Sequence, residues 1–198
     1  MSPRSPEQFA HMRTERQAAI LQTALELFAD RGYANTSIAA IARKAGMATG
    51  LLYNYFASKE ALLQALLEKC MHEMTAPVLP LMDRLDSLDT WHLVVDRLFA
   101  SLKDHPVQWT LYFSLLLQPS MQGRLPANLT EADGQFIEAL RQCLAREGVA
   151  DPHTESMLFH FAMVGAMTQY VMEPSAFSLD QIVATLKDHL GNLRKKTA

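Results

Sequence analysis

The chain has 198 residues, 49% of them hydrophobic and 20% charged, and its formal net charge is −3 at pH 7. This length suffices for one large or two small domains with a sizeable core, and the negative charge argues against a non-specific coat for nucleic acid. No apolar run approaches the roughly 20 residues of a membrane span and no signal-peptide pattern opens the chain, so we expect a cytoplasmic protein.

Apolar residues recur at helical spacing along the chain and strand-like alternation is scarce, which predicts an all-α fold of about nine helices. The charge is unevenly spread. Residues 1–60 carry seven Lys or Arg against five Asp or Glu, net +2, and residues 61–198 carry eleven against sixteen, net −5. A mildly basic N-terminal part on an acidic body suits a protein that docks DNA at one end.

The chain begins with a proline-containing tail and continues into a helix. Residues 1–8 are expected to be disordered, although Arg4 can reach a DNA minor groove as basic N-terminal arms do. The helix that follows ends just before Gly32. Its apolar stripe consists of Ile20, Leu21, Ala24, Leu27 and Phe28.

Residues 36–60 are the most informative stretch. Either Thr36 or Ser37 can cap a short helix, Gly46 sits where a chain leaving a helix turns left-handed, and a second short helix follows over residues 49–55. Two short helices joined by a glycine turn are typical of a helix-turn-helix, whose second helix enters a DNA major groove. The apolar residues expected inside this unit are Ile38, Ile41, Ala42, Ala45, Leu52 and Phe56.

This stretch resembles the tetracycline-repressor (TetR) family of bacterial transcription regulators. The resemblance implies a DNA-binding head of three helices, residues 1–57, joined to a helical body, residues 58–198, that binds a small effector and dimerises. It covers the first quarter to third of the chain. The matching residues are Ala24, Phe28, Arg31, Gly32, Tyr33, Thr36, Ala39, Ile41, Ala42, Ala45, Gly46, Gly50, Leu51, Leu52, Tyr53, Tyr55, Phe56, Ser58, Lys59 and Glu60.

Two residues depart from the family pattern. Ala48 stands where the family usually has Ser, and Ala caps a helix about 1 kcal/mol less well. Thr49 can cap the second helix instead, which would occupy a hydroxyl otherwise available to a base. Ala40 replaces a common acidic residue. Where the second helix begins is therefore open.

The exposed face of the second helix is expected to contact DNA. Gly50 lets backbones approach, Leu51 can touch a thymine methyl, and Thr49 or Asn54 can hydrogen-bond a base edge. Packing within the head is the alternative for Leu51 and Tyr53. By the resemblance, phosphates are held by Thr36, Ser37, Tyr53, Tyr55 and Lys59, and helix-start amides beside Lys59 also attract anions.

Further helices are expected throughout the body. Ser58 caps a fourth helix that ends at Pro77, Thr90 caps a helix over residues 91–103, and Pro106 opens the next one. Residues 119–128 read as a loop. The remaining helices are expected near residues 81–88, 136–144 (closing at Gly148), 153–172 and 182–193.

The body is rich in aromatic and Met side chains, and the eleven Met residues of the whole chain favour an adaptable apolar effector pocket. Each side chain taken singly is also well explained as core. Tyr112, His160 and Gln169 are candidate polar handles, and the lack of excess basic side chains predicts a neutral or weakly polar, largely hydrophobic effector. The candidate walls are Phe99, Trp109, Tyr112, Phe113, Phe136, Met163 and Met167.

Helix 153–172 carries small residues on one face, which allows another helix to approach closely. Together with the apolar stripe of the last helix it resembles the family's four-helix dimer interface; the alternative is a core within one chain. The residues assigned to the interface are Leu158, Ala162, Gly165, Ala166, Gln169, Ile182, Leu186, Leu190 and Leu193.

Neither metal nor catalytic chemistry is indicated. The seven His residues show no ligand spacing, Cys70 and Cys143 read as buried or idle thiols, and no nucleophile or phosphate-binding motif occurs, so no enzyme and no cofactor are expected. The sequence thus predicts a ligand-responsive transcriptional regulator, a repressor released from a palindromic DNA operator by a small effector and acting as a homodimer. The alternative is a DNA-binding protein of the same fold controlled by protein partners or acting architecturally.

Overall fold

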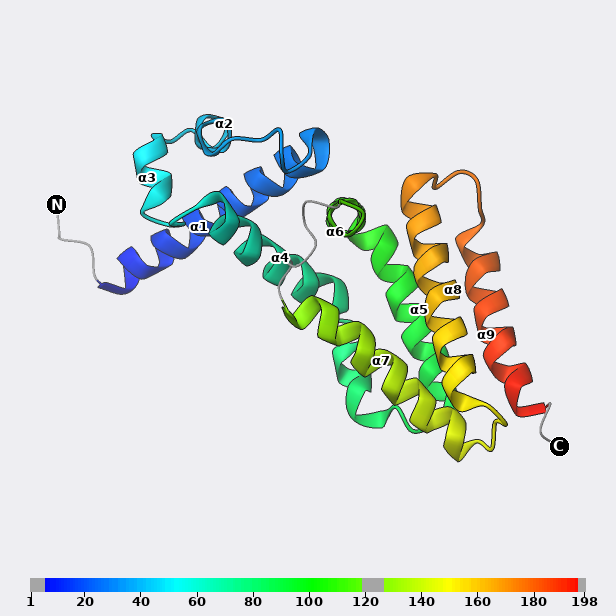
Figure 1. Cartoon of the computed structure of the whole chain (residues 1–198). Coiled ribbons are helices and arrows are strands. Elements are labelled where there is room, and N and C mark those ends of the chain that lie inside the picture. Colours follow the sequence, from blue (N-terminus) through cyan, green and yellow to red (C-terminus); the bar gives the residue numbers. More distant parts are fainter. Residues whose placement is uncertain (1–5, 119–126, 196–198) are drawn as a thin grey trace.

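The computed structural model describes residues 6–118 and 127–195, and in these residues it contains nine α-helices, one 3-10 helix and no strand. The all-α prediction is confirmed. Figure 1 shows α1–α3 at one end, α5–α9 at the other, and α4 running between them. The helices are α1 (Pro6–Arg31), α2 (Ile38–Lys44), α3 (Thr49–Tyr53), α4 (Lys59–Thr75), the 3-10 helix η1 (Leu79–Arg84), α5 (Leu88–Asp104), α6 (Pro106–Leu116), α7 (Ala127–Arg146), α8 (Pro152–Met172) and α9 (Leu179–Lys195).

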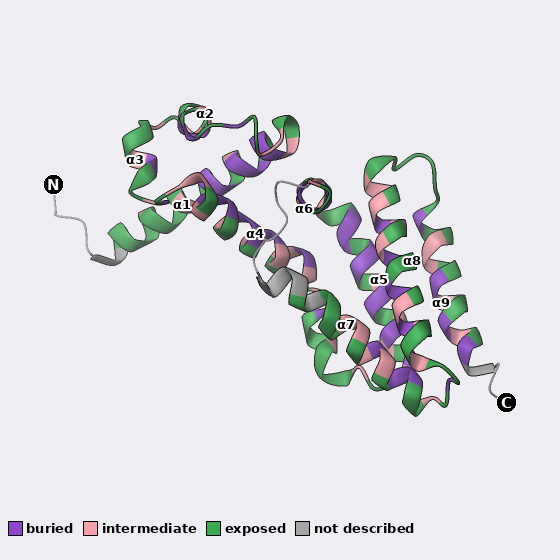
Figure 2. Ribbon diagram, viewed as in Figure 1, coloured by how far each residue is buried: buried purple, intermediate pink, exposed green. Residues whose placement is uncertain are grey.

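The head is a small unit in which α1, α2, α3 and the start of α4 share one core. α2 packs against α1 and α3, and α4 packs against α1. The expected apolar residues lie inside, except that Ala45 is only partly buried at the C-cap of α2. Figure 2 shows this buried surface turned inward along α1 and α4. The buried set is Ile20, Leu21, Ala24, Leu27, Phe28, Ile38, Ile41, Ala42, Leu52 and Phe56.

Serine caps set the start of several helices. The hydroxyl of Ser37 accepts a hydrogen bond from the Ala40 amide at 3.1 Å, and that of Ser58 accepts from the Ala61 amide at 3.1 Å. Both were predicted, Ser37 as one of two alternatives. The prediction of Thr90 as a cap is wrong. Ser87 caps α5, because its extended backbone (φ −133°, ψ 151°) orients the hydroxyl toward the helix amides.

A glycine follows the end of α1 and the end of α2, as expected. Gly32 after α1 has φ +78° and Gly46 after α2 has φ +67°, a left-handed conformation that side chains with a Cβ rarely adopt. Gly46 therefore allows α3 to follow α2 after a turn of only a few residues.

Three segments either differ from the predicted secondary structure or lie outside the residues that the structure describes. Residues 6–8, predicted as part of a disordered tail, belong to the first turns of α1, whereas Arg4 lies outside the described residues. The helix expected near residues 81–88 is the shorter 3-10 helix η1, with Pro80 near its start. The predicted loop over residues 119–128 falls largely outside the described residues, and α7 begins at Ala127.

The body is a bundle organised around α5. This helix buries Trp91, Val95, Phe99 and Leu102 and packs against α4, η1, α6, α7, α8 and α9. α7 pairs with α8, and α8 with α9. Head and body meet through two routes, because α4 continues from one into the other and α6 packs against α1.

The predicted boundary between residues 57 and 58 falls immediately before the α4 cap, Ser58. Leu62, Leu63 and Leu66 on α4 nevertheless pack into one continuous core with residues of α1. Among the described residues, no helix is both long and apolar enough to cross a membrane.

Candidate functional site

The second helix of the turn motif, α3, lies at the outer edge of the head, away from the body (Figure 1). It spans Thr49–Tyr53 and its N-cap is Ala48, which provides no side-chain hydrogen bond. Thr49 is thus the first residue of the helix and does not cap it, so its hydroxyl is available. Leu52 is fully buried and anchors the helix to the core.

The outward face of α3 combines hydrogen-bonding groups with a backbone open to close approach. Thr49, Gly50, Tyr53 and Asn54 are exposed, and a Cβ added at Gly50 would meet nothing within 4 Å. Leu51 is half-buried, so its side chain is shared between packing and the outer surface.

Arg13 of α1 braces the exit of α3, and the sequence did not point to it. Its guanidinium lies 5.3 Å from the ring centroid of Tyr55, and its Nη2 donates to the Asn54 carbonyl at 3.3 Å. Tyr55 is accordingly half-buried. Arg13 and Asn54 are 41 residues apart along the chain, so no local pattern could reveal the contact.

The two adjacent hydroxyls at residues 36 and 37 have different roles. Ser37 is exposed and caps α2. Thr36 is 2% exposed, and its Oγ1 lies 2.9 Å from the Gly32 carbonyl and 3.2 Å from the Leu27 carbonyl, to which it can donate. The structure therefore corrects the assignment of Thr36 to phosphate binding, because its hydroxyl faces the end of α1.

Lys59 fastens the start of α4 to the end of α1. Its Nζ donates to the Tyr33 carbonyl and lies 4.1 Å from the centroid of the Tyr33 ring. Partial burial lowers the pKa of Lys59, against the opposing effect of the neighbouring Glu60 carboxylate. An ammonium group has three donors, so Lys59 can hold the Tyr33 carbonyl and still contact an anion.

The predicted effector walls do not enclose one cavity. Trp109, Tyr112 and Phe113 pack on one another, with ring centroids 5.3–5.8 Å apart, and the Trp109 indole donates to Ser101 Oγ at 2.8 Å. Met163 and Met167 are buried in the core. For these five residues the structure favours the core interpretation.

A groove of about 420 Å³ lies between α4, η1, α5 and α7. Phe136 is the one predicted wall residue that lines it. The α4 residues of its wall recur at helical spacing and look, in the sequence, like the solvated face of that helix, so they were not predicted. The lining residues are Glu68, Met71, His72, Thr75, Val78, Leu79, Met82, Leu98, Gln135 and Phe136.

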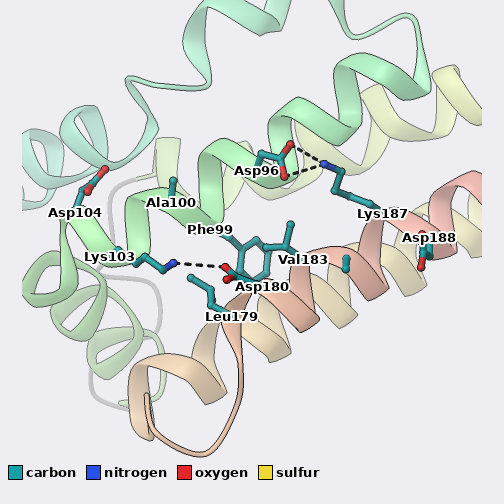
Figure 3. A pocket seen from close by; sticks show the side chains of 11 residues that line it. Asp96, Phe99, Ala100, Lys103, Asp104, Leu179, Asp180, Val183, Lys187 and Asp188 are labelled. Atoms are coloured by element: carbon teal, nitrogen blue, oxygen red, sulfur yellow. Dashed lines mark hydrogen bonds and ion pairs between the residues drawn. The ribbon is translucent and has the colours of Figure 1, made fainter.

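A second groove, of about 530 Å³, separates α5 from α9 and contains the remaining wall residue, Phe99. Figure 3 shows two ion pairs across it. Lys187 Nζ donates to both carboxylate oxygens of Asp96 at 3.0 and 2.8 Å, and Lys103 lies 3.6 Å from Asp180. These pairs join α5 to α9, so we interpret this groove as part of the packing contact between the two helices and not as a ligand site.

Two of the three candidate polar handles, Tyr112 of α6 and His160 of α8, both interact with Asp133 of α7. His160 is 6% exposed, its Nε2 lies 3.8 Å from Asp133 Oδ1, and its Nδ1 has no hydrogen-bond partner among the described residues. Burial lowers the pKa of His160 and raises that of Tyr112 to about 12, the latter with a contribution from Asp133. Gln169 is exposed and lies elsewhere on α8.

The face assigned to a dimer divides into two parts. Leu158, Ala162, Gly165 and Gln169 are exposed along α8, Ala166 and Ile182 are half-buried, and the neighbouring Phe161 is 58% exposed. This leaves an unusually apolar outer surface on α8. The assignment of the α9 leucines is corrected, since they pack within the chain's own core. These are Leu186, Leu190 and Leu193.

In the described part of the chain, no three His, Cys, Asp or Glu side chains come together in a way that could hold a metal ion. Cys70 and Cys143 are free and buried. Burial raises the pKa of the Cys70 thiol to about 12 and that of Cys143 to about 11, which disfavours the reactive thiolate.

Comparison with known proteins agrees with this arrangement. The sequence model described as "Bacterial regulatory proteins, tetR family" matches residues 20–66, which include α2, α3 and the start of α4. The transcriptional regulator YuxN of Bacillus subtilis is 29% identical over 73% of this chain and 45% of its own length. The transcriptional repressor KstR2 of Mycolicibacterium smegmatis is 42% identical over 34% of this chain and 31% of its own length. The matches thus span less than half of either relative.

Solved structures share the whole fold. A TetR-like regulator from Rhodococcus superposes with a TM-score of 0.76 at 20% identity, covering 89% of this chain and 94% of its own. NalD of Pseudomonas aeruginosa, described as the secondary repressor of a multidrug efflux pump, gives 0.72 at 23% identity, with coverage of 90% and 95%. At these identities the likeness establishes a shared helical head and body, and no more.

Proposed function

The head of this chain belongs to the tetR family of bacterial regulatory proteins, and from that premise we propose that the protein is a ligand-responsive transcriptional regulator. It acts as a repressor, binds a palindromic DNA operator as a homodimer, and is released by a small hydrophobic effector. Its relatives carry the names of transcriptional regulators, and none of the described residues forms a metal-binding group.

The observation that carries the DNA-binding proposal is the composition of the exposed face of α3. Thr49 and Asn54 offer donors and acceptors to base edges, Leu51 offers a methyl contact for thymine, and Gly50 permits close approach. Ser37, Tyr53, Tyr55 and Lys59 border this face and are assigned to phosphates, which fix the register of a protein on its site. Arg13 keeps Tyr55 in place.

Dimerisation is assigned to the outer surface of α8. A dimer places two α3 helices in successive major grooves, one DNA turn or a multiple of it apart, and so calls for a palindromic site. Gly165 and Ala162 are exposed on α8, and such small residues let a second helix approach closely. Leu158 and Phe161, both more than half exposed, supply apolar area on the same helix.

Effector control is assigned to α4, because one rigid helix starts beside the DNA-contacting face and later lines the α4–α7 groove, the 420 Å³ groove described above. A ligand in this groove shifts the equilibrium between head positions only if it binds one of them more tightly. Hydrophobic effectors are in keeping with the names of similar proteins, which refer to fatty acids and ketosteroids.

The test begins with selection of random DNA duplexes by the purified protein, which should enrich a palindrome. Lys59→Gln should then weaken binding and flatten the salt dependence by about one unit, the slope of one lost phosphate contact. Lys69→Gln is the matched control, since Lys69 sits on the same helix roughly 15 Å farther from the head and pairs with Glu73 at 3.2 Å. If no sequence is enriched, the proposal is contradicted. If both variants have equal effects, the role of Lys59 is contradicted.

Release by an effector is tested separately with hydrophobic compounds. Trp91 lies edge-on to the groove residue Phe136, with centroids 4.9 Å apart, so its fluorescence in a Trp109→Phe variant should change with binding. A broad screen that yields no releasing compound would favour the alternative, a DNA-binding protein of this fold controlled by protein partners.

A further inference from the structure

We infer that the α4–α7 groove selects a lipophilic cation, a molecule with an apolar body and a single ammonium-type head. The inference rests on the proposed function in one respect, namely that this groove is the effector site. It assigns the charge of the ligand and the residue that reads it, Glu68.

The groove supplies an apolar bed of a size suited to a small organic molecule. Its volume of about 420 Å³ lies within the usual range for ligand sites, roughly 300–1,000 Å³. Thioether sulfurs adapt to irregular ligands, and two Met side chains are among the walls. The apolar lining consists of Met71, Val78, Leu79, Met82, Leu98 and Phe136.

Glu68 is the only acidic side chain among the described residues that line the groove. Its Oε1 accepts a hydrogen bond from the neutral amide of Gln64 at 3.1 Å, and no Lys or Arg is among the described residues of the lining. The nearest Lys on α4, Lys69, is paired with Glu73 at 3.2 Å. No Lys or Arg of the described lining therefore compensates the carboxylate of Glu68, which attracts a cation.

The other polar lining residues fit the same ligand. Thr75 donates its hydroxyl proton to the Met71 carbonyl at 2.7 Å, so its oxygen remains an acceptor. His72 lies one helical turn after Glu68 on the same face of α4 and is the one imidazole of the lining. Gln135 adds an amide that can donate or accept.

The Phe136 ring adds an aromatic surface held in a fixed orientation. Trp91 packs edge-on against it at 4.9 Å, and the His160 ring lies 5.5 Å away. The face of an aromatic ring attracts a cation within about 6 Å of its centroid. A carboxylate together with an aromatic ring favours an organic cation over an anion.

The same features disfavour the acyl carboxylates suggested by relatives named for fatty acid metabolism. Glu68 is exposed, so a charged head beside it keeps part of its hydration, and the repulsion between two carboxylates decides against an anion. The groove places such a head near Glu68, which repels it. The chain therefore differs from those relatives in the charge of the ligand it accepts.

The test uses three ligands that share one decyl chain and differ in their heads: 1-aminodecane, a cation at pH 7, decanoate and 1-decanol. Binding to the full-length protein is measured by calorimetry without DNA and below micelle-forming concentrations. We expect the amine to bind about ten-fold or more tightly than the alcohol, a free-energy difference of about 1.4 kcal/mol, and decanoate to bind more weakly than either.

Three variants assign the preference to Glu68. Glu68→Gln should remove the advantage of the amine and leave the alcohol unchanged, and Glu68→Lys should reverse the preference toward decanoate. Glu173→Gln, the same charge change at the exposed C-cap of α8, should change nothing. Tighter binding of decanoate to the unaltered protein, an amine preference that survives Glu68→Gln, or no amine binding at all would overturn the inference.

Release of operator DNA is recorded as a separate measurement. Glu68-dependent amine binding without DNA release would leave the inference intact and refute effector control through this groove. DNA release by compounds that do not compete with the amine would place the controlling site elsewhere, again without touching the charge selectivity of the groove.

Discussion

Replacing Ala48 by Ser should stabilise α3, the helix assigned to DNA contact. Ala48 already has the extended backbone of an N-cap, with φ −69° and ψ 142°, but no side-chain acceptor. Ser37, Ser58 and Ser87 occupy the equivalent position in α2, α4 and α5, and each hydroxyl accepts from the amide three residues later at 3.1–3.3 Å. A serine hydroxyl introduced by Ala48→Ser should accept from the Leu51 amide in the same way.

The size of the effect follows from what the Leu51 amide does now. It donates to the Ala48 carbonyl at 3.0 Å, so it is not an unpaired group and the added bond is partly redundant. Ser in place of Ala at an N-cap contributes about 0.5–2 kcal/mol, and the lower part of that range, about 0.5–1 kcal/mol, applies here. For a chain of this size, about 1 kcal/mol raises Tm by roughly 2–4 °C.

The assay is urea and thermal unfolding followed by circular dichroism. Ala48→Val is the control, because Ala48 is exposed and Val fits there without offering an acceptor, and Ser58→Ala should lose about 1 kcal/mol as the reverse case. Equal stability of the Ala48→Ser and Ala48→Val proteins would refute the capping argument. Tighter operator binding by the Ala48→Ser protein is also expected, because α3 is then ordered before it meets DNA.

Two further substitutions test the structural role of Thr36 and the assignment of the dimer interface to α8. Thr36→Val should cost about 1–2 kcal/mol of stability, because it removes the donor to the Gly32 and Leu27 carbonyls, and it should leave the salt slope of DNA binding unchanged; a flatter slope would restore Thr36 as a phosphate ligand. Gly165→Trp should give a folded monomer in light scattering, since a Cβ at Gly165 meets nothing within 4 Å of its own chain, and a persistent dimer would move the interface off α8.

The head could be predicted from sequence because local rules decide most of it. Gly32 and Gly46 mark helix ends through a backbone conformation that other residues avoid, and Ser58 marks a helix start through one hydrogen bond. Thr36 shows where such rules stop. Thr36 and Ser37 are both competent caps, and only the position of the α1 carbonyls decides which hydroxyl turns inward.

The α4–α7 groove could not be predicted for a different reason. An aromatic side chain at a buried helical position looks the same in a sequence whether a ligand or another ring covers it. Trp109 and Phe113 stack on each other at 5.6 Å, which only the packing of the helices reveals. The groove is instead lined by residues such as Glu68 and His72. These are polar residues of α4, and in the sequence they look like part of an ordinary solvent-exposed helix face.

For the surface assigned to dimerisation, the sequence could not tell which of two amphipathic helices, α8 or α9, leaves its apolar stripe uncovered. α8 and α9 both carry apolar stripes. Periodicity indicates that each stripe packs against something, but it does not show whether the partner is in the same chain or in a second copy. Leu186 and Leu190 of α9 are buried inside the chain, where α9 packs against α5 and α8. α8 is apolar on more than one side, since Phe159 is buried while Leu158 and Phe161 are exposed, so α8 has large apolar side chains left for a partner.

The way α4 is held limits how a ligand signal can reach the head. Its buried stripe, from Leu62 to Met74, belongs to the continuous core, so the helix moves as a unit. A helix of 17 residues is roughly 25 Å long, and a tilt of a few degrees at the groove becomes a shift of an ångström or two at Lys59. Because α6 also packs against α1, such a tilt has to slide α1 along α6. Head movement therefore depends on both contacts. In the proposed dimer, a ligand that wedges α4 against η1 changes the spacing of the two heads only when the α1–α6 contact yields with it.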